Sequence, residues 1–135
     1  SCLIPEEYMN DVLMRLKYYK KISSCENKKD IIHIKDEFID IYGPMPEHLN
    51  NLLSLTNLKL EIKQKNIKFI KIIDNLIKIE FKNQKLIDID HIINITENMD
   101  LKILKNGMIQ LKIDTNNFDD LCTKAADIIQ RFMRS

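Results

Sequence analysis

The sequence of 135 residues is poor in glycine, cysteine and long apolar runs. Its two glycines leave no glycine-rich loop that could surround a phosphate, which argues against nucleotide binding. Its three cysteines, Cys2, Cys25 and Cys122, are far apart and form no CxxC pair, which argues against a disulfide framework or a zinc site. No apolar run approaches the roughly 20 residues that a membrane-spanning helix needs. We therefore expect reduced thiols and a cytoplasmic location.

An excess of charge of one sign is also missing. The 21 Lys and Arg residues balance 20 Asp and Glu residues, so no overall field attracts the chain to nucleic acid or anionic lipid. A hydrophobic content of 44% and a charged content of 30% are typical of a globular protein. This length favours a single domain over residues 1–135, helical to about residue 66 and built of hairpins and helices from about residue 67. The chain opens on Ser1 and not on Met, which is typical of a fragment or a processed chain.

Apolar residues in the first half recur at three- and four-residue steps, which predicts three helices. The first helix runs from Pro5 to about Ser23, and its predicted core face consists of Met9, Val12, Leu13, Leu16 and Tyr19. The second helix is marked by Ile31, Ile34, Phe38 and Ile41. It ends at Gly43-Pro44, because glycine is common just after the last helical residue and proline is common one or two residues further on. The third opens at Pro46 and is apolar around more than one face, so we expect it to be the most buried.

After Asn66 the apolar period changes to two, which predicts strands. Two strands lie within residues 67–82, with Asp74-Asn75 as a two-residue turn between them. Two further strands, residues 101–105 and 108–113, are joined by Asn106-Gly107, where Gly107 supplies a positive φ.

Two more helices complete the second half. One extends from Asp88 or Asp90 to Met99. The last is an amphipathic helix capped near Asn116 or Asn117, with an apolar stripe of Phe118, Leu121, Cys122, Ala125, Ile129 and Phe132. The order ααα-ββ-α-ββ-α predicts an α+β fold with a small antiparallel sheet of two hairpins.

Catalytic or metal-binding groupings are hard to find. His33, His48 and His91 are isolated and show no HxxxH or HExxH spacing, which favours surface or packing roles. Asp88 and Asp90 beside His91 could hold a metal, but Asp before a short helix is more simply a cap. Because no nucleophile, paired carboxylates or cofactor loop can be assembled, we expect no enzymatic activity and no cofactor for this chain.

A basic cluster lies on the first helix, where Arg15, Lys17, Lys20 and Lys21 are interleaved with two tyrosines. Lysines alternating with aromatic residues can form a nucleic-acid contact, which would use Lys17, Lys20 and Lys21. The alternative is a solvated face whose aromatic rings are in the core. The nearly neutral net charge favours this alternative.

An acidic cluster lies in the last turns of the second helix. Asp36, Glu37 and Asp40 stand where the helix dipole disfavours anions, and no Lys or Arg lies three or four residues away to pair with them. Carboxylates at an unfavourable end of the helix, with no neighbouring cation in the helix to offset them, favour a docking site for a basic partner. An acidic surface kept for solubility, or paired with a Lys elsewhere in the fold, remains open.

Several short motifs follow one another in residues 3–67. They are IPEEY at 4–8, DV at 11–12, RL at 15–16, YKKI at 19–22, EFIDIYGPMP at 37–46, NLL at 51–53 and LKL at 58–60. In order and spacing they resemble the C-terminal (TRCF) domain of bacterial transcription-repair coupling factor, with its IPEDY, DV, RL, YKRI and EL-x-D-R-F-G-P-x-P motifs. Phe132-Met133-Arg134 resembles the closing helix of that family.

The resemblance implies a parent protein that is an ATP-driven DNA translocase. Such a protein displaces stalled RNA polymerase and recruits nucleotide excision repair, and ATP and magnesium serve its motor, whose motifs this chain lacks. The resemblance further implies that this domain is a non-catalytic clamp. It would fold back on an N-terminal module similar to the excision-repair helicase subunit and cover the surface that recruits the damage-recognition ATPase.

By position, the acidic members of the family's helix-end motif fall on Glu37 and Asp40, which the resemblance places opposite arginines of the N-terminal module. Ile41 stands where the family commonly has Arg, and Tyr42 where it has Phe. We expect the partner-binding residues to be Asp36, Glu37, Asp40 and Tyr42. The alternative is an accessory domain of a repair protein that contacts nucleic acid.

Overall fold

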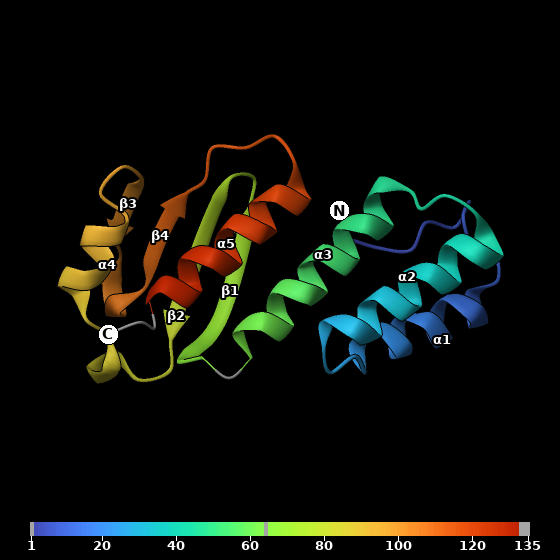
Figure 1. Cartoon of the computed structure of the whole chain (residues 1–135), viewed down its shortest axis with the longest axis horizontal. Helices are drawn as coiled ribbons and strands as arrows, with labels where there is room; N and C mark the ends of the chain where they lie inside the picture. The colour runs from blue at the N-terminus through green and yellow to red at the C-terminus, as the bar shows by residue number, and fades with distance from the viewer. Residues whose placement is uncertain (1, 64, 133–135) are drawn as a thin grey trace. The chain divides into compact units, whose positions relative to one another are not determined.

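The computed structural model describes residues 2–63 and 65–132 (Figure 1). Three helices come first: α1 (Val12–Ser23), α2 (Lys28–Tyr42) and α3 (Glu47–Ile62). They are followed by β1 (Ile67–Ile73), β2 (Leu76–Phe81), α4 (Ile89–Ile95), β3 (Asp100–Ile103), β4 (Ile109–Lys112) and α5 (Phe118–Phe132). This order confirms the predicted α+β fold. Within the described residues, no helix combines the length and the apolar character needed to cross a membrane.

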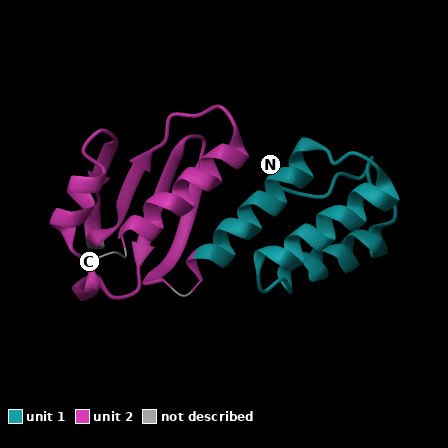
Figure 2. Ribbon diagram, in the orientation of Figure 1, with its two compact units in different colours: residues 1–61 teal, residues 62–135 magenta. Residues whose placement is uncertain are grey.

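The chain divides into two compact units, Ser1–Glu61 and Ile62–Ser135 (Figure 2). The first contains α1, α2 and nearly all of α3, and the second contains the sheet with α4 and α5. The division lies close to the predicted change from helical to hairpin structure. That both units form a single domain stays a prediction.

The core of the first unit is built around Phe38 of α2, whose side chain is fully buried. The ring centroid of Tyr18 lies 4.9 Å from that of Phe38, and the ring centroid of Tyr8 lies 6.3 Å from it. The Tyr8 hydroxyl donates hydrogen bonds to the carbonyls of Phe38, at 3.0 Å, and Gly43, at 2.7 Å. Gly43 ends α2 as predicted, with a φ of 88° that favours glycine. The end of α2 is therefore fixed by the core and by its backbone.

The predicted start of the first helix at Pro5 is wrong. Helix α1 begins at Val12, and Asp11 is its N-cap, with a carboxylate oxygen accepting a hydrogen bond from the amide of Leu13 at 2.9 Å. The amides of Tyr8 and Met9 both donate to the carbonyl of Pro5 at 3.1 Å, which closes a separate turn. Asp11 starts the helix because its side chain satisfies an amide that has no partner within the helix.

The core face predicted for the first helix is also wrong in part. Val12, Leu13 and Leu16 are 55%, 71% and 57% exposed, whereas Tyr18 and Ile22 are buried. On a helix of about 3.6 residues per turn, Leu13 points roughly 140° away from Tyr18. Helix α1 has apolar residues on two faces, and the face that packs is the one that brings Tyr18 against Phe38. Ile41, one of the apolar residues that mark the second helix in the sequence, is likewise exposed.

We expect Leu13→Ala to change the free energy of unfolding by less than about 0.5 kcal/mol, because this side chain is exposed. Ile22→Val on the same helix removes one buried methyl group and should cost about 1 kcal/mol. Urea denaturation followed by circular dichroism measures both values. A larger loss for Leu13→Ala than for Ile22→Val would contradict the observed orientation of α1.

The second unit contains a four-stranded antiparallel sheet in the order β1-β2-β4-β3. Helix α5 runs across one face of this sheet (Figure 1). Alternate residues of β2 and β4 are buried, as period-2 strands require. The predicted apolar stripe of α5 is buried from Leu121 to Phe132, with Phe118 partly buried. The predicted cap is confirmed at Asn117, whose side-chain oxygen accepts from the amide of Asp120 at 2.9 Å.

The two hairpins close differently. Asp74-Asn75 forms the predicted two-residue turn, because Ile73 pairs with Leu76. The predicted two-residue turn at Asn106-Gly107 is wrong: Ile103 pairs with Ile109, so residues 104–108 form the connection. This register places apolar residues opposite each other, whereas a two-residue turn would place Ile103 opposite Gln110. Gly107 nevertheless has the predicted positive φ, of 74°.

The remaining predicted boundaries differ in detail. Helix α4 begins after its N-cap Asp88, as predicted, but ends at Ile95 and not at Met99. Helix α3 follows Pro46 as predicted and starts at Glu47. Met133 and Arg134 of the predicted closing motif lie outside the described residues.

Candidate functional site

Helix α2 has an inner and an outer face. Its side-chain cap is Asn27, which accepts a hydrogen bond from the amide of Asp30 at 3.0 Å. The inner face consists of the buried residues Ile31, Ile34 and Phe38. The outer face contains Ile32, Asp36, Ile39 and Asp40; Asp36 lies four residues after Ile32, three before Ile39 and four before Asp40. Helical spacing alone therefore presents two carboxylates and two aliphatic side chains together at the surface.

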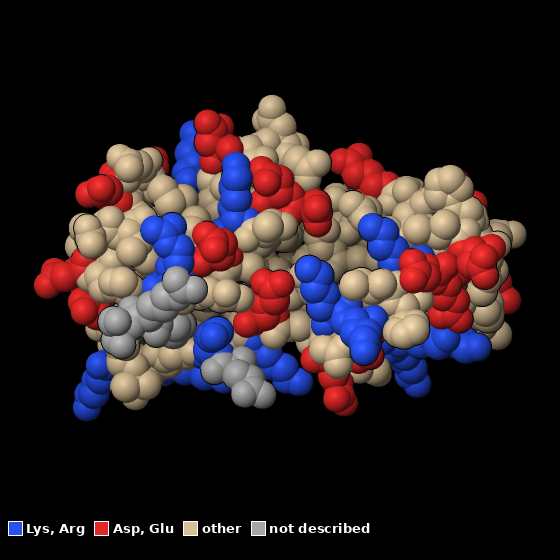
Figure 3. All heavy atoms as spheres, in the orientation of Figure 1, with Lys and Arg blue, Asp and Glu red and all other residues tan. Residues whose placement is uncertain are grey.

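Part of this outer face forms a shallow, open depression, which we call the acidic face. It is lined by Asp36, Glu37, Ile39 and Asp40. In the view of Figure 3, acidic atoms gather over the C-terminal part of α2 and basic atoms lie toward its N-terminal end, whereas both signs are mixed over the second unit. Within the part of the chain that the structure describes, no Lys or Arg lies within 4.0 Å of the carboxylates of Asp36 or Asp40. These two carboxylates are therefore exposed and uncompensated.

Glu37 differs from its two acidic neighbours. Its carboxylate is paired with Lys21 of α1, whose ammonium lies 3.2 Å from both Oε1 and Oε2. Pairing with a Lys elsewhere in the fold is an alternative that the sequence leaves open for the acidic cluster, and for Glu37 the structure shows such a pair. The same ammonium lies 5.1 Å from the ring centroid of Tyr18. Burial, and after it Glu37, raises the pKa of the Tyr18 hydroxyl.

Tyr42 lies beside the core and not on the outer face. Its ring centroid is 5.6 Å from that of Tyr8 and 6.4 Å from that of Tyr18, and the residue is partly buried. The geometry gives it a packing role behind the acidic face. Its part in partner binding stays a prediction.

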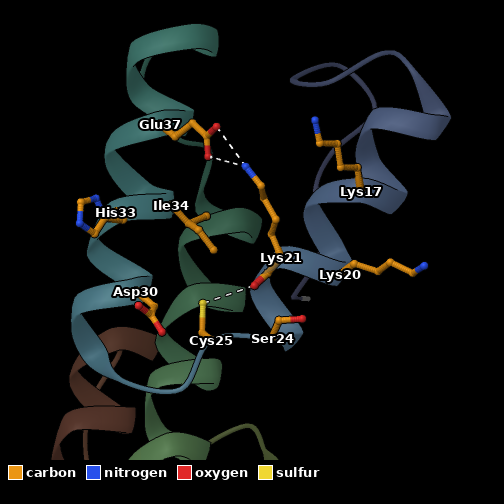
Figure 4. Close-up of a pocket in the computed structure, with 9 residues that line it drawn as sticks. All are labelled: Lys17, Lys20, Lys21, Ser24, Cys25, Asp30, His33, Ile34 and Glu37. Atoms are coloured by element: carbon orange, nitrogen blue, oxygen red, sulfur yellow. Dashed lines mark hydrogen bonds and ion pairs between the residues drawn. The ribbon is translucent and has the colours of Figure 1, made fainter.

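The predicted basic cluster borders an open groove between α1 and α2 (Figure 4). Its lysines are Lys17, Lys20 and Lys21. Lys21 reaches across toward Glu37, whereas Lys20 points away from α2. Asp30 and Glu37 also line the groove, so it is not uniformly basic.

The other members of the basic cluster are engaged in local structure. The Arg15 guanidinium donates to the carbonyls of Met9, at 2.8 Å, and Asn10, at 3.0 Å. Tyr18 is buried, and the Tyr19 hydroxyl accepts a hydrogen bond from the amide of Ile4 at 2.8 Å. Neither tyrosine presents a ring on which a base could stack freely, which favours the packing role that the sequence left as an alternative.

Reactive groups are few around the groove. Burial raises the pKa of the Cys25 thiol, with Asp30 adding to the effect, so this thiol is a poor nucleophile.

The predicted capping role of Asp88 is the one that the structure shows: Asp88 caps α4 by accepting a hydrogen bond from the amide of His91 at 3.1 Å. Over residues 2–63 and 65–132, no three His, Cys, Asp or Glu side chains are grouped to hold a metal ion. The acidic face thus combines carboxylates with an exposed isoleucine in an open depression, which are features of a binding surface.

Comparison with known structures places this fold in a class. The chain is similar to the crystal structure of a C-terminal domain of transcription-repair coupling factor, with a TM-score of 0.71 and 22% sequence identity. The similarity covers 97% of this chain and 88% of that one. The fold is thus that of an α+β C-terminal domain of this class.

The sequence identifies the family. A profile of the TRCF domain matches residues 1–92, and the chain belongs to this family. It is 40% identical over 65 residues to the transcription-repair-coupling factor of Haemophilus influenzae, covering 48% of this chain and 6% of that protein. It is 32% identical over 113 residues to that of Borreliella burgdorferi, covering 84% of this chain and 10% of that protein. The family resemblance predicted from the motifs is confirmed, and the chain spans about a tenth or less of these relatives' lengths.

Proposed function

We propose that this chain is the regulatory C-terminal domain of a bacterial transcription-repair coupling factor and docks through its acidic face on the N-terminal repair-recruitment module of the same protein. The parent is an ATP-driven DNA translocase that displaces stalled RNA polymerase in the cytoplasm. The docked domain covers the surface that recruits the damage-recognition ATPase of nucleotide excision repair. The domain itself supplies binding and no chemistry, while ATP and magnesium act at the motor.

One observation carries this proposal: Asp36 and Asp40 are exposed, no Lys or Arg of the described residues lies within 4.0 Å of their carboxylates, and the exposed Ile39 lines the same depression. This combination suits arginine, because a guanidinium can bind a carboxylate with two parallel hydrogen bonds. Its aliphatic stem can meanwhile cover an isoleucine side chain. A partner surface with arginines would thus satisfy both the charge and the apolar area of the acidic face.

The exposed position of the acidic face also suits reversible docking. Exposed ion pairs are individually weak and are screened by salt. A covalent link between domain and partner supplies an effective concentration on the order of millimolar, so a weak contact still stays closed. Binding of polymerase or DNA elsewhere in the parent could then open it at small energetic cost.

The test is a titration of isotope-labelled chain with the N-terminal module of the same parent, followed by NMR. We expect resonances of α2 to shift for the wild type. For Asp36→Arg/Asp40→Arg we expect affinity to fall at least about ten-fold, because two attractive contacts become repulsive. Glu37 is left unchanged, since its replacement would also release Lys21 from the contact between α1 and α2.

The matched control is Glu97→Arg/Asp114→Arg, which changes the net charge equally at two exposed positions of the second unit. It should bind like the wild type. Equal weakening by both double variants would mean that net charge alone governs binding. Absence of wild-type binding at high micromolar concentration would refute docking on this module.

The second candidate is an accessory nucleic-acid contact through Lys17, Lys20 and Lys21. It is favoured by the exposure of Lys17 and Lys20, for which the described structure shows no ion pair within 4.0 Å. Steeply salt-dependent DNA binding that Lys17→Glu/Lys20→Glu removes would support it. Absence of binding at low salt would exclude it.

A further inference from the structure

Glu37 lies at the boundary between two hollows of the first unit. On one side it borders the acidic face with Asp36 and Asp40, and on the other it borders the groove that contains Lys21. Its carboxylate is partly exposed, with 35% of the side-chain surface accessible. A cation from either hollow can therefore reach the same two oxygens.

Lys21 already occupies those oxygens from the groove side. Its ammonium lies 3.2 Å from Oε1 and 3.2 Å from Oε2, so it is shared between both. Its position over the Tyr18 ring adds a cation–π contact at 5.1 Å. Figure 4 shows the side chain extended from α1 across the groove to Glu37, while Lys20 points away from α2.

We propose that Lys21 is an internal competitor that lowers the affinity of the acidic face for an incoming cationic side chain. A guanidinium that binds Glu37 with two hydrogen bonds needs both oxygens, and Lys21 must first leave them. The free energy of the Lys21–Glu37 pair is therefore subtracted from that of binding. This inference rests on the proposed docking and adds a residue of α1 that sets how tightly the docked state is held.

The size of the effect follows from the exposure of the pair. Lys21 is 40% exposed and Glu37 is 35% exposed, so water screens the pair. Surface pairs of this kind change an equilibrium by roughly two- to five-fold. Lys21 thus tunes the docked state without abolishing it. The domain can release its partner more readily than its three carboxylates alone would allow.

The first experiment titrates the chain with a tetra-arginine peptide, followed by NMR of α2, for the wild type, Lys21→Met and Lys20→Met. Both variants lose one positive charge from α1, but only Lys21 contacts Glu37. We expect Lys21→Met to bind about two- to five-fold more tightly than Lys20→Met. Lys21→Gln, which keeps a polar side chain, should behave like Lys21→Met. Thermal unfolding establishes that every variant is folded.

Equal affinity of Lys21→Met and Lys20→Met would overturn the competition, because loss of charge alone would then explain any gain. Weaker binding by Lys21→Met would also overturn it and would make Lys21 a positioning residue for Glu37. No binding of the peptide to any variant would refute a cation site on this face. The same variants titrated with the N-terminal module separate the two proposals: binding without a Lys21 effect keeps the docking and rejects the competition.

Discussion

Replacing Phe38 with alanine is expected to lower the free energy of unfolding by about 3–5 kcal/mol, which is comparable to the whole stability of a marginal domain. The side chain is fully buried, and its ring packs against those of Tyr18 and Tyr8. Truncation removes apolar contact and leaves a cavity that the surrounding helices can fill only in part. The aromatic contacts that set the orientation of α1 against α2 are lost with it.

Urea denaturation followed by circular dichroism measures this loss, and Ile41→Ala is the matched control on the same helix. Ile41 is 58% exposed, so its truncation should cost less than about 0.5 kcal/mol. Both residues belong to the apolar pattern that marks this helix in the sequence, and only the structure shows that one is buried and the other exposed. A similar cost for the two substitutions would contradict the observed faces of α2.

The same helix rotation that buries Phe38 presents the acidic face. Asp36 and Asp40 are two residues before and after Phe38 in the sequence, which places them on the opposite side of the helix. The acidic face is thus held by the core behind it. A variant that remains folded with Phe38 truncated should lose docking chiefly through misplacement of these carboxylates.

Sequence periodicity predicted α5 well and α1 poorly, for a physical reason. The apolar residues of α5 form one stripe, so only one orientation buries them. Helix α1 has apolar residues on two sides, and a sequence contains no information on which side meets Phe38 until the fold is assembled. The second hairpin shows the same limit, because cross-strand pairing of apolar residues overrode the local preference of Asn106-Gly107 for a two-residue turn.

The candidate site was predictable to the extent that it is local. Asp36 and Asp40 stand on one helix with no Lys or Arg three or four residues away, and in the described structure no Lys or Arg lies within 4.0 Å of their carboxylates. The Lys21–Glu37 pair joins two helices and depends on the rotation of α1, which periodicity assigned wrongly in part. By sequence position alone, Lys21 belongs with Lys17 and Lys20. Only the folded structure shows that Lys21 pairs with Glu37.

Replacing Ile129 with alanine should cost about 2–5 kcal/mol, because this fully buried residue packs α5 against the sheet. It lines a small apolar gap with Ile77, Ile79 and Leu111 of the sheet, and truncation would enlarge this gap into a larger cavity. Asp127→Ala, at an exposed position of the same helix, is the control and should be nearly neutral. A loss below 1 kcal/mol for Ile129→Ala would contradict this packing.

The same variant tests the single-domain prediction. The chain has no Trp, and all four tyrosines lie in the first unit, so tyrosine fluorescence reports on that unit alone. Circular dichroism reports on both units. If the chain unfolds as one domain, Ile129→Ala shifts the fluorescence and dichroism transitions together. A fluorescence transition that stays at its wild-type midpoint would show that the two units unfold independently, and the acidic face would then persist in a chain whose second unit is unfolded.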